Sequence, residues 1–246
     1  MIDRFAYTAM TGAKHAMGQL GNTAHNLANL QTPGFREMLT TFRAVPVEGA
    51  RASSRAFVVD STPGVSAAAG PLVSTGHALD VAIDGPGYFV LQRPDGSQAY
   101  SRMGKFQIDT QGRLIGAQGH PVLGEKGPIR VAANARDVEI LANGEIHAIL
   151  PGATRHTRID VLRRVDAPTR DLTMAGDGLF ESDRPLPPQA DVRVKQRAYE
   201  GSNVSMADAM VQMIKQNRLF DLNMRLVQAA EQNAKQAGSL MSLSRV

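Results

Sequence analysis

Residues 202–243 read SNVSMADAMVQMIKQNRLFDLNMRLVQAAEQNAKQAGSLMSL, and the rest of the chain is organised around this segment. Its apolar residues recur at alternating steps of four and three, the heptad pattern of a helix that buries a narrow stripe against another helix. Ser205 and Asp208 provide a helix start, because such side chains at this spacing satisfy the first free backbone donors. At ~1.5 Å per residue the predicted helix is roughly 60 Å long, more than a compact domain of this mass needs.

Two apolar stripes run along this predicted helix. The first supplies the C-terminal part of a predicted assembly interface: Met206, Met210, Met213, Phe220, Met224 and Val227. The second lies beside it and comprises Val211, Leu222, Leu226, Ala230 and Leu240. Two helical partners could therefore be accommodated.

Residues 2–30 repeat the heptad pattern with smaller side chains. Gly12, Gly18 and Gly21 lie within it, and a glycine costs ~1 kcal/mol in a helix interior, so this helix needs close neighbours. Pro33 and Gly34 end it. The residues that we expect to form its part of the assembly interface are Phe5, Met10, Met17, Leu20, Leu27 and Asn29.

The apolar period changes from helical to alternating at Leu79, and short strands then alternate with turns, including a strong hairpin signal at Asn143 and Gly144. This pattern predicts a mainly antiparallel β domain, either a sandwich or a barrel. We therefore expect an α+β fold whose terminal helices pair as a coiled-coil-like stalk. The predicted segments are an N-terminal helix and turn (1–37), an extended arm with one short strand at 56–59 (38–78), the β domain (79–190), and a strand followed by the C-terminal helix (191–246).

Composition argues against several classes of function. Cysteine is absent, so a disulfide, a thiolate metal site and a thiol nucleophile are excluded. No apolar segment approaches the ~20 residues that span a bilayer, and we expect neither lipid insertion nor a cleaved signal peptide. The formal charge of +4 is scattered, and the basic cluster at 155–164 is interspersed with acids, so nucleic acid is not an expected partner.

Candidate catalytic and ligand-binding residues are few. Asp80 and Asp84 could act as a carboxylate pair, although capping of turns is the simpler interpretation. Gly85 and Gly87 lack the third glycine of a dinucleotide loop and precede a strand, which argues against nucleotide binding. The six histidines lack metal-ligand spacing, and the absence of Trp disfavours a carbohydrate-binding module. We expect no catalytic residue, no cofactor and no metal.

Three motifs, in this order, resemble the signatures of the axial proteins of the bacterial flagellum, the rod and hook subunits. They are NLANLQTPGF at 26–35, DVAIDGPGYFV at 80–90 with YSRMGKF at 100–106, and EGSNV at 200–204. The opening YTAMTGA at 7–13 and the chain length resemble the proximal rod members, with distal rod and hook subunits as alternatives. The signature residues are Asn26, Leu27, Ala28, Asn29, Thr32, Gly34, Phe35, Gly85, Gly87, Ser202, Asn203 and Val204.

This resemblance implies a structural function. It implies export through the flagellar type III apparatus without a cleaved signal, followed by assembly with proximal and distal rod subunits and with further copies of the chain. The resulting rod of the basal body spans the periplasm and transmits torque for motility, and contact with peptidoglycan is compatible with that position. The residues alone are equally compatible with a helix pair within one chain, and the second stripe favours assembly. A cell-wall-acting β-domain enzyme with oligomerising helices is the alternative from another class.

Overall fold

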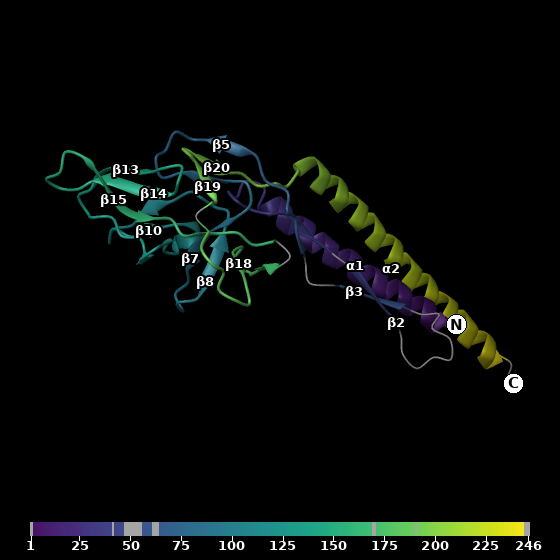
Figure 1. Ribbon diagram of the computed structural model, residues 1–246. Helices are drawn as coiled ribbons and strands as arrows, with labels where there is room; N and C mark the ends of the chain where they lie inside the picture. Colours follow the sequence, from purple (N-terminus) through teal and green to yellow (C-terminus); the bar gives the residue numbers. More distant parts are fainter. Residues whose placement is uncertain are drawn as a thin grey trace. The chain divides into compact units, whose positions relative to one another are not determined.

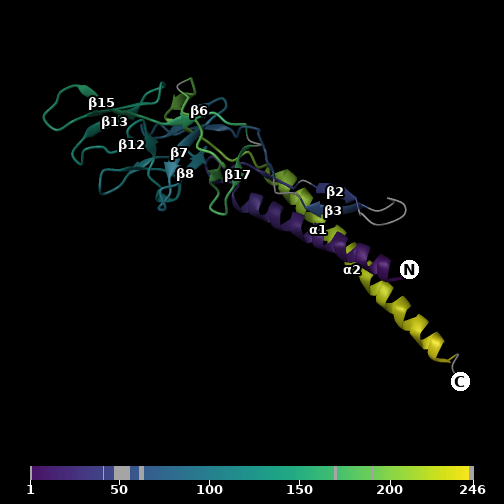
Figure 2. The same cartoon turned by 60° about the horizontal axis from the view of Figure 1, so that its bottom comes forward.

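The structure is a computed structural model that describes residues 2–40, 42–46, 56–60, 64–168, 171–189 and 191–243 (Figures 1 and 2). The chain divides into two compact units, and each unit combines segments that are distant in sequence. Unit 1 comprises Met1–Ala28, Met38–Pro63 and Ser205–Val246. Unit 2 comprises Asn29–Glu37 and Gly64–Val204.

Unit 1 contains the two terminal helices, α1 (Ile2–Ala28) and α2 (Met206–Leu243), which run side by side in opposite directions (Figures 1 and 2). The predicted pairing of the terminal helices is therefore confirmed. The Ser205 Oγ accepts a hydrogen bond from the Asp208 backbone N at 3.4 Å, which is the expected start of α2. Unit 1 also contains β1 (Met38–Leu39) and an antiparallel pair, β2 (Phe42–Pro46) and β3 (Ala56–Asp60), of which only β3 was predicted.

Unit 2 is built from short strands, and every ladder between them is antiparallel. A five-stranded sheet has the order β16 (Arg164–Val165), β7 (Tyr88–Gln92), β8 (Gln98–Ser101), β18 (Phe180–Glu181) and β17 (Thr173–Met174). A three-stranded sheet has the order β13 (Arg136–Ile140), β14 (Glu145–Ile149) and β15 (His156–Val161). In this part of the described chain the strands form separate sheets and no closed barrel, which confirms the α+β class.

The remaining elements of unit 2 are smaller. Four two-stranded sheets pair β5 (Leu72–Ser74) with β20 (Ala198–Glu200), β6 (Val81–Asp84) with β19 (Arg193–Gln196), β9 (Gln107–Ile108) with β10 (Leu114–Ile115), and β11 (Leu123–Gly124) with β12 (Gly127–Pro128). The described part of unit 2 also contains β4 (Gly64–Val65) and the short 3-10 helix η1 (Ala117–Gly119). The predicted hairpin turn is confirmed, because Gly144 adopts a φ of 79° and its N donates to the Leu141 O at 2.8 Å.

Strand β7 lies between two hydrophobic clusters and organises the core of unit 2. Phe89 and Leu91 belong to one cluster, whereas Tyr88 and Val90 belong to the other. All four residues are buried, since successive side chains of a strand point to opposite faces and here both faces are covered. A strand that is apolar at consecutive positions is the sequence pattern expected of such a central position.

Candidate assembly interface

Small residues line the stripe that is buried between α1 and α2. On α1 this stripe passes through Ala9, Ala13, Ala16, Leu20 and Thr23, and on α2 through Ala209, Met213, Phe220, Asn223, Val227 and Ala230. These positions alternate by four and three on α1, and on α2 they do so apart from one full heptad step between Met213 and Phe220. We call them the helix seam. Alanine allows the two backbones to approach closely, because it places only a methyl group between them.

Gly12 marks a close approach of the two helices. A Cβ atom added at this position would lie 2.6 Å from the Asn223 Oδ1. The Asn223 Nδ2 in turn donates to the Leu219 O at 2.8 Å, within its own helix. Gly12 lowers the helix propensity of α1, but its missing side chain leaves room for the side chain of Asn223 on α2.

The predicted interface residues of the N-terminal helix divide into two groups. Leu20 and Leu27 are half-buried and follow the seam. Phe5, Met10 and Met17 lie outside it and are 48%, 59% and 64% exposed. The seam therefore coincides with the predicted stripe at Leu20 and Leu27, but it passes through Ala9 and Ala16, each one residue before the predicted Met10 and Met17. Asn29 belongs to unit 2, where its Oδ1 accepts a hydrogen bond from the Thr32 Oγ1 at 3.1 Å.

The C-terminal helix shows the same division. Met213, Phe220 and Val227 are half-buried in the seam, whereas Met206, Met210 and Met224 are 53%, 52% and 38% exposed. Most of the predicted second stripe is also exposed, namely Val211, Leu222 and Leu226, while Ala230 is buried. The side chain of Leu240 lies outside the described residues. We call the exposed apolar residues of α1 and α2 the outer faces of unit 1.

In unit 2 the family motifs meet around one buried carboxylate, that of Glu200, which is 1% exposed. The Arg36 Nη2 lies 2.8 Å from its Oε1, and the Arg102 Nε donates to its Oε2 at 2.6 Å. The backbone N of Gly70 also donates to Oε1, at 3.0 Å. Four segments that are far apart in sequence are thereby held together by charge-assisted hydrogen bonds.

Both arginines around Glu200 also donate hydrogen bonds to backbone carbonyls. The Arg36 Nη1 donates to the carbonyls of Ala67 and Ala68, and the Arg102 Nη1 donates to those of Gly85 and Gly87 at 2.9 and 2.7 Å. Burial lowers the pKa of Arg36, and the charge of Glu200 opposes that shift. The site is therefore a buried ion cluster in which both oxygens of the Glu200 carboxylate are engaged, and it offers little to a ligand. We call Arg36, Arg102 and Glu200 the Glu200 cluster.

Several predicted signature residues support this cluster or a local turn through backbone contacts. The Asn203 side chain accepts from the Glu37 N at 2.7 Å and donates to the Ala68 O at 2.8 Å. Gly34 adopts a φ of +69°, and its N donates to the Glu200 O at 2.7 Å. In unit 1, Asn26 accepts from the Met38 N at 2.9 Å and donates to the Met38 O at 3.0 Å. These contacts match the interpretation that the motif asparagines bind backbone.

The other signature residues have similarly local environments. Gly85 and Gly87 adopt φ values of +97° and +133°, which favour glycine. Ser202 accepts from the Val204 N at 3.3 Å through its Oγ, and Val204 is buried. Phe35 is buried as well, Thr32 and Ala28 are exposed, and Leu27 is half-buried. The sequence-based site prediction omitted Arg36, Arg102 and Glu200, although two of them lie within the quoted motifs and a charged residue amid glycines was the available signal.

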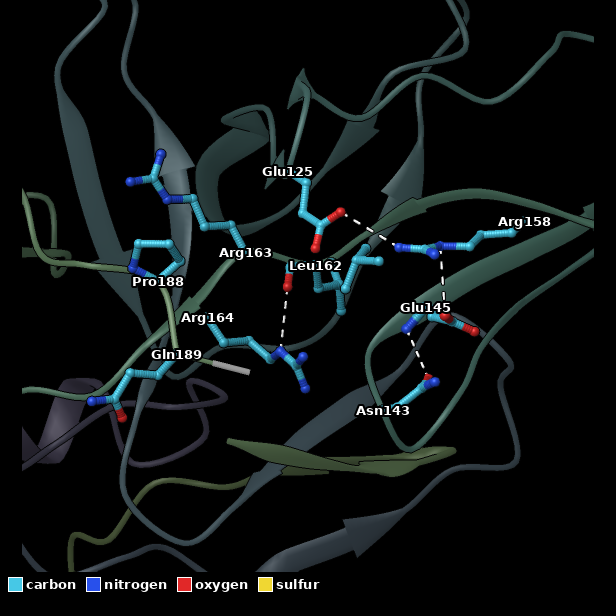
Figure 3. A pocket seen from close by; sticks show the side chains of 10 residues that line it. Glu125, Asn143, Glu145, Arg158, Leu162, Arg163, Arg164, Pro188 and Gln189 are labelled. Carbon is cyan, nitrogen blue, oxygen red and sulfur yellow. Dashed lines mark hydrogen bonds and ion pairs between the residues drawn. The ribbon is translucent and has the colours of Figure 1, made fainter. Parts of the chain in front are cut away.

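Unit 2 also contains a cavity of about 620 Å³ beside the hairpin turn at Asn143 (Figure 3). Within it Arg158 lies between Glu125 and Glu145, at 3.4 and 3.5 Å. Hydrogen bonding with Asn143 and His147 lowers the pKa of Glu145. Arg158 thus lies beside both carboxylates, and the lowered pKa of Glu145 is the opposite of the raised pKa expected of a general acid.

The two members of the predicted carboxylate pair, Asp80 and Asp84, differ in burial. Asp80 is 4% exposed and accepts a hydrogen bond from the Thr75 Oγ1 at 2.7 Å, whereas Asp84 is exposed at the end of β6. Among the residues that the structure describes, no group of three His, Asp or Glu side chains is arranged to hold a metal ion. The described helices include none that is long and apolar enough to cross a membrane.

Comparisons with known proteins identify the family. The model of the "Flagellar hook protein FlgE/F/G D1 domain" matches residues 82–148, and that of the "Flagellar basal body rod FlgEFG protein C-terminal" matches residues 195–240. The flagellar basal-body rod protein FlgF of Escherichia coli (strain K12) is 40% identical, over 99% of this chain and 100% of the relative. FlgF of Salmonella typhimurium is 38% identical over the same shares, and FlgG of Agrobacterium fabrum is 29% identical over 92% and 95%. The chain therefore belongs to the flagellar basal-body rod protein family and is most like its FlgF members.

Proposed function

We propose that this protein is a structural subunit of the bacterial flagellar basal-body rod, which assembles through its terminal helices into the axial drive shaft that transmits torque for motility. The observation that carries the proposal is the exposure of large apolar side chains on both terminal helices. The helix seam takes up alanines and a few larger residues such as Phe220, whereas Met10, Met17 and Leu222 each remain more than half exposed.

The outer faces of unit 1 give association a physical driving force. Each Å² of apolar surface removed from water contributes about 25 cal/mol, so a row of such side chains along a helix favours a further helical partner. A helix pair that was complete within one chain would leave few large apolar side chains exposed. The exposure of Met10, Met17 and Leu222 instead supports assembly with further copies of this chain and with other proximal and distal rod subunits. A distal rod or hook position would use the same faces, and the similarity to FlgF members favours the proximal one.

The proposal extends to export and location. Rod subunits of this kind would pass through the flagellar type III export apparatus without a cleaved signal and join a rod that spans the periplasm, a position compatible with contact with peptidoglycan. The proposed function is mechanical and not enzymatic, which is supported by the ion pairs of Arg158 with both carboxylates of the cavity and by the hydrogen bond of Thr75 to Asp80. Neither nucleic acid nor lipid is a proposed partner.

The test places a charge on each outer face. M17E/L222E should abolish association in sedimentation velocity and should fail to restore motility to a strain that lacks the protein, because a buried unpaired carboxylate opposes interface formation. Gln228→Glu is the matched control, since Gln228 is an exposed polar residue of the same helix. Far-UV circular dichroism should show both variants folded. Equal motility and association in the two variants would refute the proposal.

A further inference from the structure

Thioether side chains are concentrated on the outer faces of unit 1. Met10 and Met17 lie on α1, and Met210 and Met224 lie on α2, all of them exposed. The chain contains no cysteine, so these sulfur atoms have no thiol of the same chain to compete with them for an oxidant.

The four methionines share one heptad position. Met10 and Met17 directly follow the seam residues Ala9 and Ala16, and Met210 directly follows the seam residue Ala209. Met224 follows Asn223, two heptads after Met210. The thioethers therefore flank the seam on both helices, on the surface through which we propose that subunits associate.

We propose that Met10, Met17, Met210 and Met224 form a peroxide-sensitive modification site whose oxidation prevents subunit association. This inference rests on the proposed function, because it assigns a regulatory chemistry to the same outer faces. The reagent class is a hydroperoxide, and the modification acts on the chain before assembly, while the sulfur atoms are exposed.

The chemistry converts an apolar contact into a polar one. Each sulfur gives two electrons to the peroxide, the O–O bond breaks, one oxygen atom becomes the sulfoxide oxygen and the other leaves as water or an alcohol. A sulfoxide oxygen buried in an apolar interface lacks a hydrogen-bond donor, so burial that favours the thioether opposes the sulfoxide. Methionine sulfoxide reductases reverse the step, which makes it a switch.

Burial elsewhere in the chain makes the modification selective. Met103 and Met174 of unit 2 are half-buried and pack against its hydrophobic clusters, and Met213 is half-buried in the helix seam. Oxidation should therefore reach the exposed methionines of the outer faces, namely Met10, Met17, Met206, Met210 and Met224, before it reaches these three. Peptide mapping by mass spectrometry measures that order.

The experiment treats the full-length monomer with dilute hydrogen peroxide and then measures association by sedimentation velocity. We expect the concentration required for association to rise by about tenfold or more, and to return to its starting value after treatment with methionine sulfoxide reductase. Untreated protein that fails to associate would overturn the proposed function and this inference together. Untreated and oxidised protein that associate equally would overturn this inference alone.

A variant assigns the effect to the four residues. M10L/M17L/M210L/M224L keeps apolar side chains of similar volume and should associate equally before and after peroxide. M10L/M17L, which changes one helix only and keeps the test available if the fourfold variant misfolds, should lose less association than the unchanged chain. A loss in either variant as large as in the unchanged chain would contradict the assignment.

Discussion

Units 1 and 2 differ in where they place large apolar side chains. Phe89, Tyr100 and Phe180 of unit 2 are at most 1% exposed, whereas Met17 and Leu222 of unit 1 are 64% and 56% exposed. Unit 2 also pairs its buried charges within itself, as the Glu200 cluster shows. The comparison teaches that unit 2 buries its largest apolar side chains in a single copy, while unit 1 leaves large apolar side chains exposed on both of its helices.

The largest expected effect concerns the Glu200 cluster. Glu200→Gln leaves the buried guanidinium groups of Arg36 and Arg102 without a countercharge and should destabilise unit 2 by about 3–5 kcal/mol. Urea unfolding followed by near-UV circular dichroism measures this change, because Tyr88 and Tyr100 are buried in unit 2. Glu125→Gln, at an exposed ion pair with Arg158, is the control and should cost at most about 1 kcal/mol.

The helical signal of the same variant tests whether units 1 and 2 are stabilised separately. If unit 1 owes its fold to the helix seam, the helical far-UV signal should persist at urea concentrations that remove the near-UV signal of Glu200→Gln. Equal stability of Glu200→Gln and Glu125→Gln would show that the cluster does not stabilise unit 2.

A smaller effect is expected at the turn that contains Gly34. A Cβ atom there would lie 2.3 Å from the Met103 N, in addition to the strain of a positive φ. Gly34→Ala should therefore destabilise unit 2 by about 1–3 kcal/mol more than Gly76→Ala. Gly76 has a similar φ of +76° and nothing within 4 Å of the added atom, so the difference isolates the steric contact. Equal unfolding midpoints for the two variants would exclude close packing of the turn.

The register of the helix seam is tested by two neighbouring residues. Ala16 is 1% exposed and Met17 is 64% exposed. Ala16→Leu should overpack the seam and cost unit 1 about 1–3 kcal/mol in thermal unfolding of the monomer. Met17→Leu should change monomer stability by less than about 0.5 kcal/mol, because its side chain contacts mainly solvent. The opposite ranking would place the seam where the sequence pattern first suggested it.

Local patterns in the sequence are sufficient for the helices, the hairpin at Asn143 and the strand at 56–59, because each depends on periodicity or turn chemistry within a few residues. The register of the seam is different. Ala16 and Met17 both fit an apolar heptad, and the choice between them depends on how closely two distant helices approach, which the close contact of Gly12 with Asn223 now shows.

The Glu200 cluster could not be predicted from the sequence, for a related reason. Arg102 and Glu200 are 98 residues apart in sequence, and no local pattern states that they share a buried site. The motifs at 100–106 and 200–204 contained both residues, yet the resemblance identified a family and not a contact. The exposure of the second stripe of α2 was expected, because the sequence shows more apolar stripes than helices to cover them. The exposure of Met10 and Met17 was not, since the sequence pattern placed both in the heptad stripe of α1.

The smallest predicted effect separates helix propensity from packing in α1. Gly21 is exposed and has nothing within 4 Å of an added Cβ atom, so Gly21→Ala should stabilise the helix by up to about 1 kcal/mol. Gly12→Ala gains the same propensity but requires Asn223 to move, so it should stabilise the monomer less or not at all. Thermal unfolding followed by far-UV circular dichroism measures both. A Gly12→Ala variant as stable as Gly21→Ala would mean that the seam tolerates an extra methyl group at its closest approach, and that unit 1 is packed more loosely than unit 2 even where its helices meet.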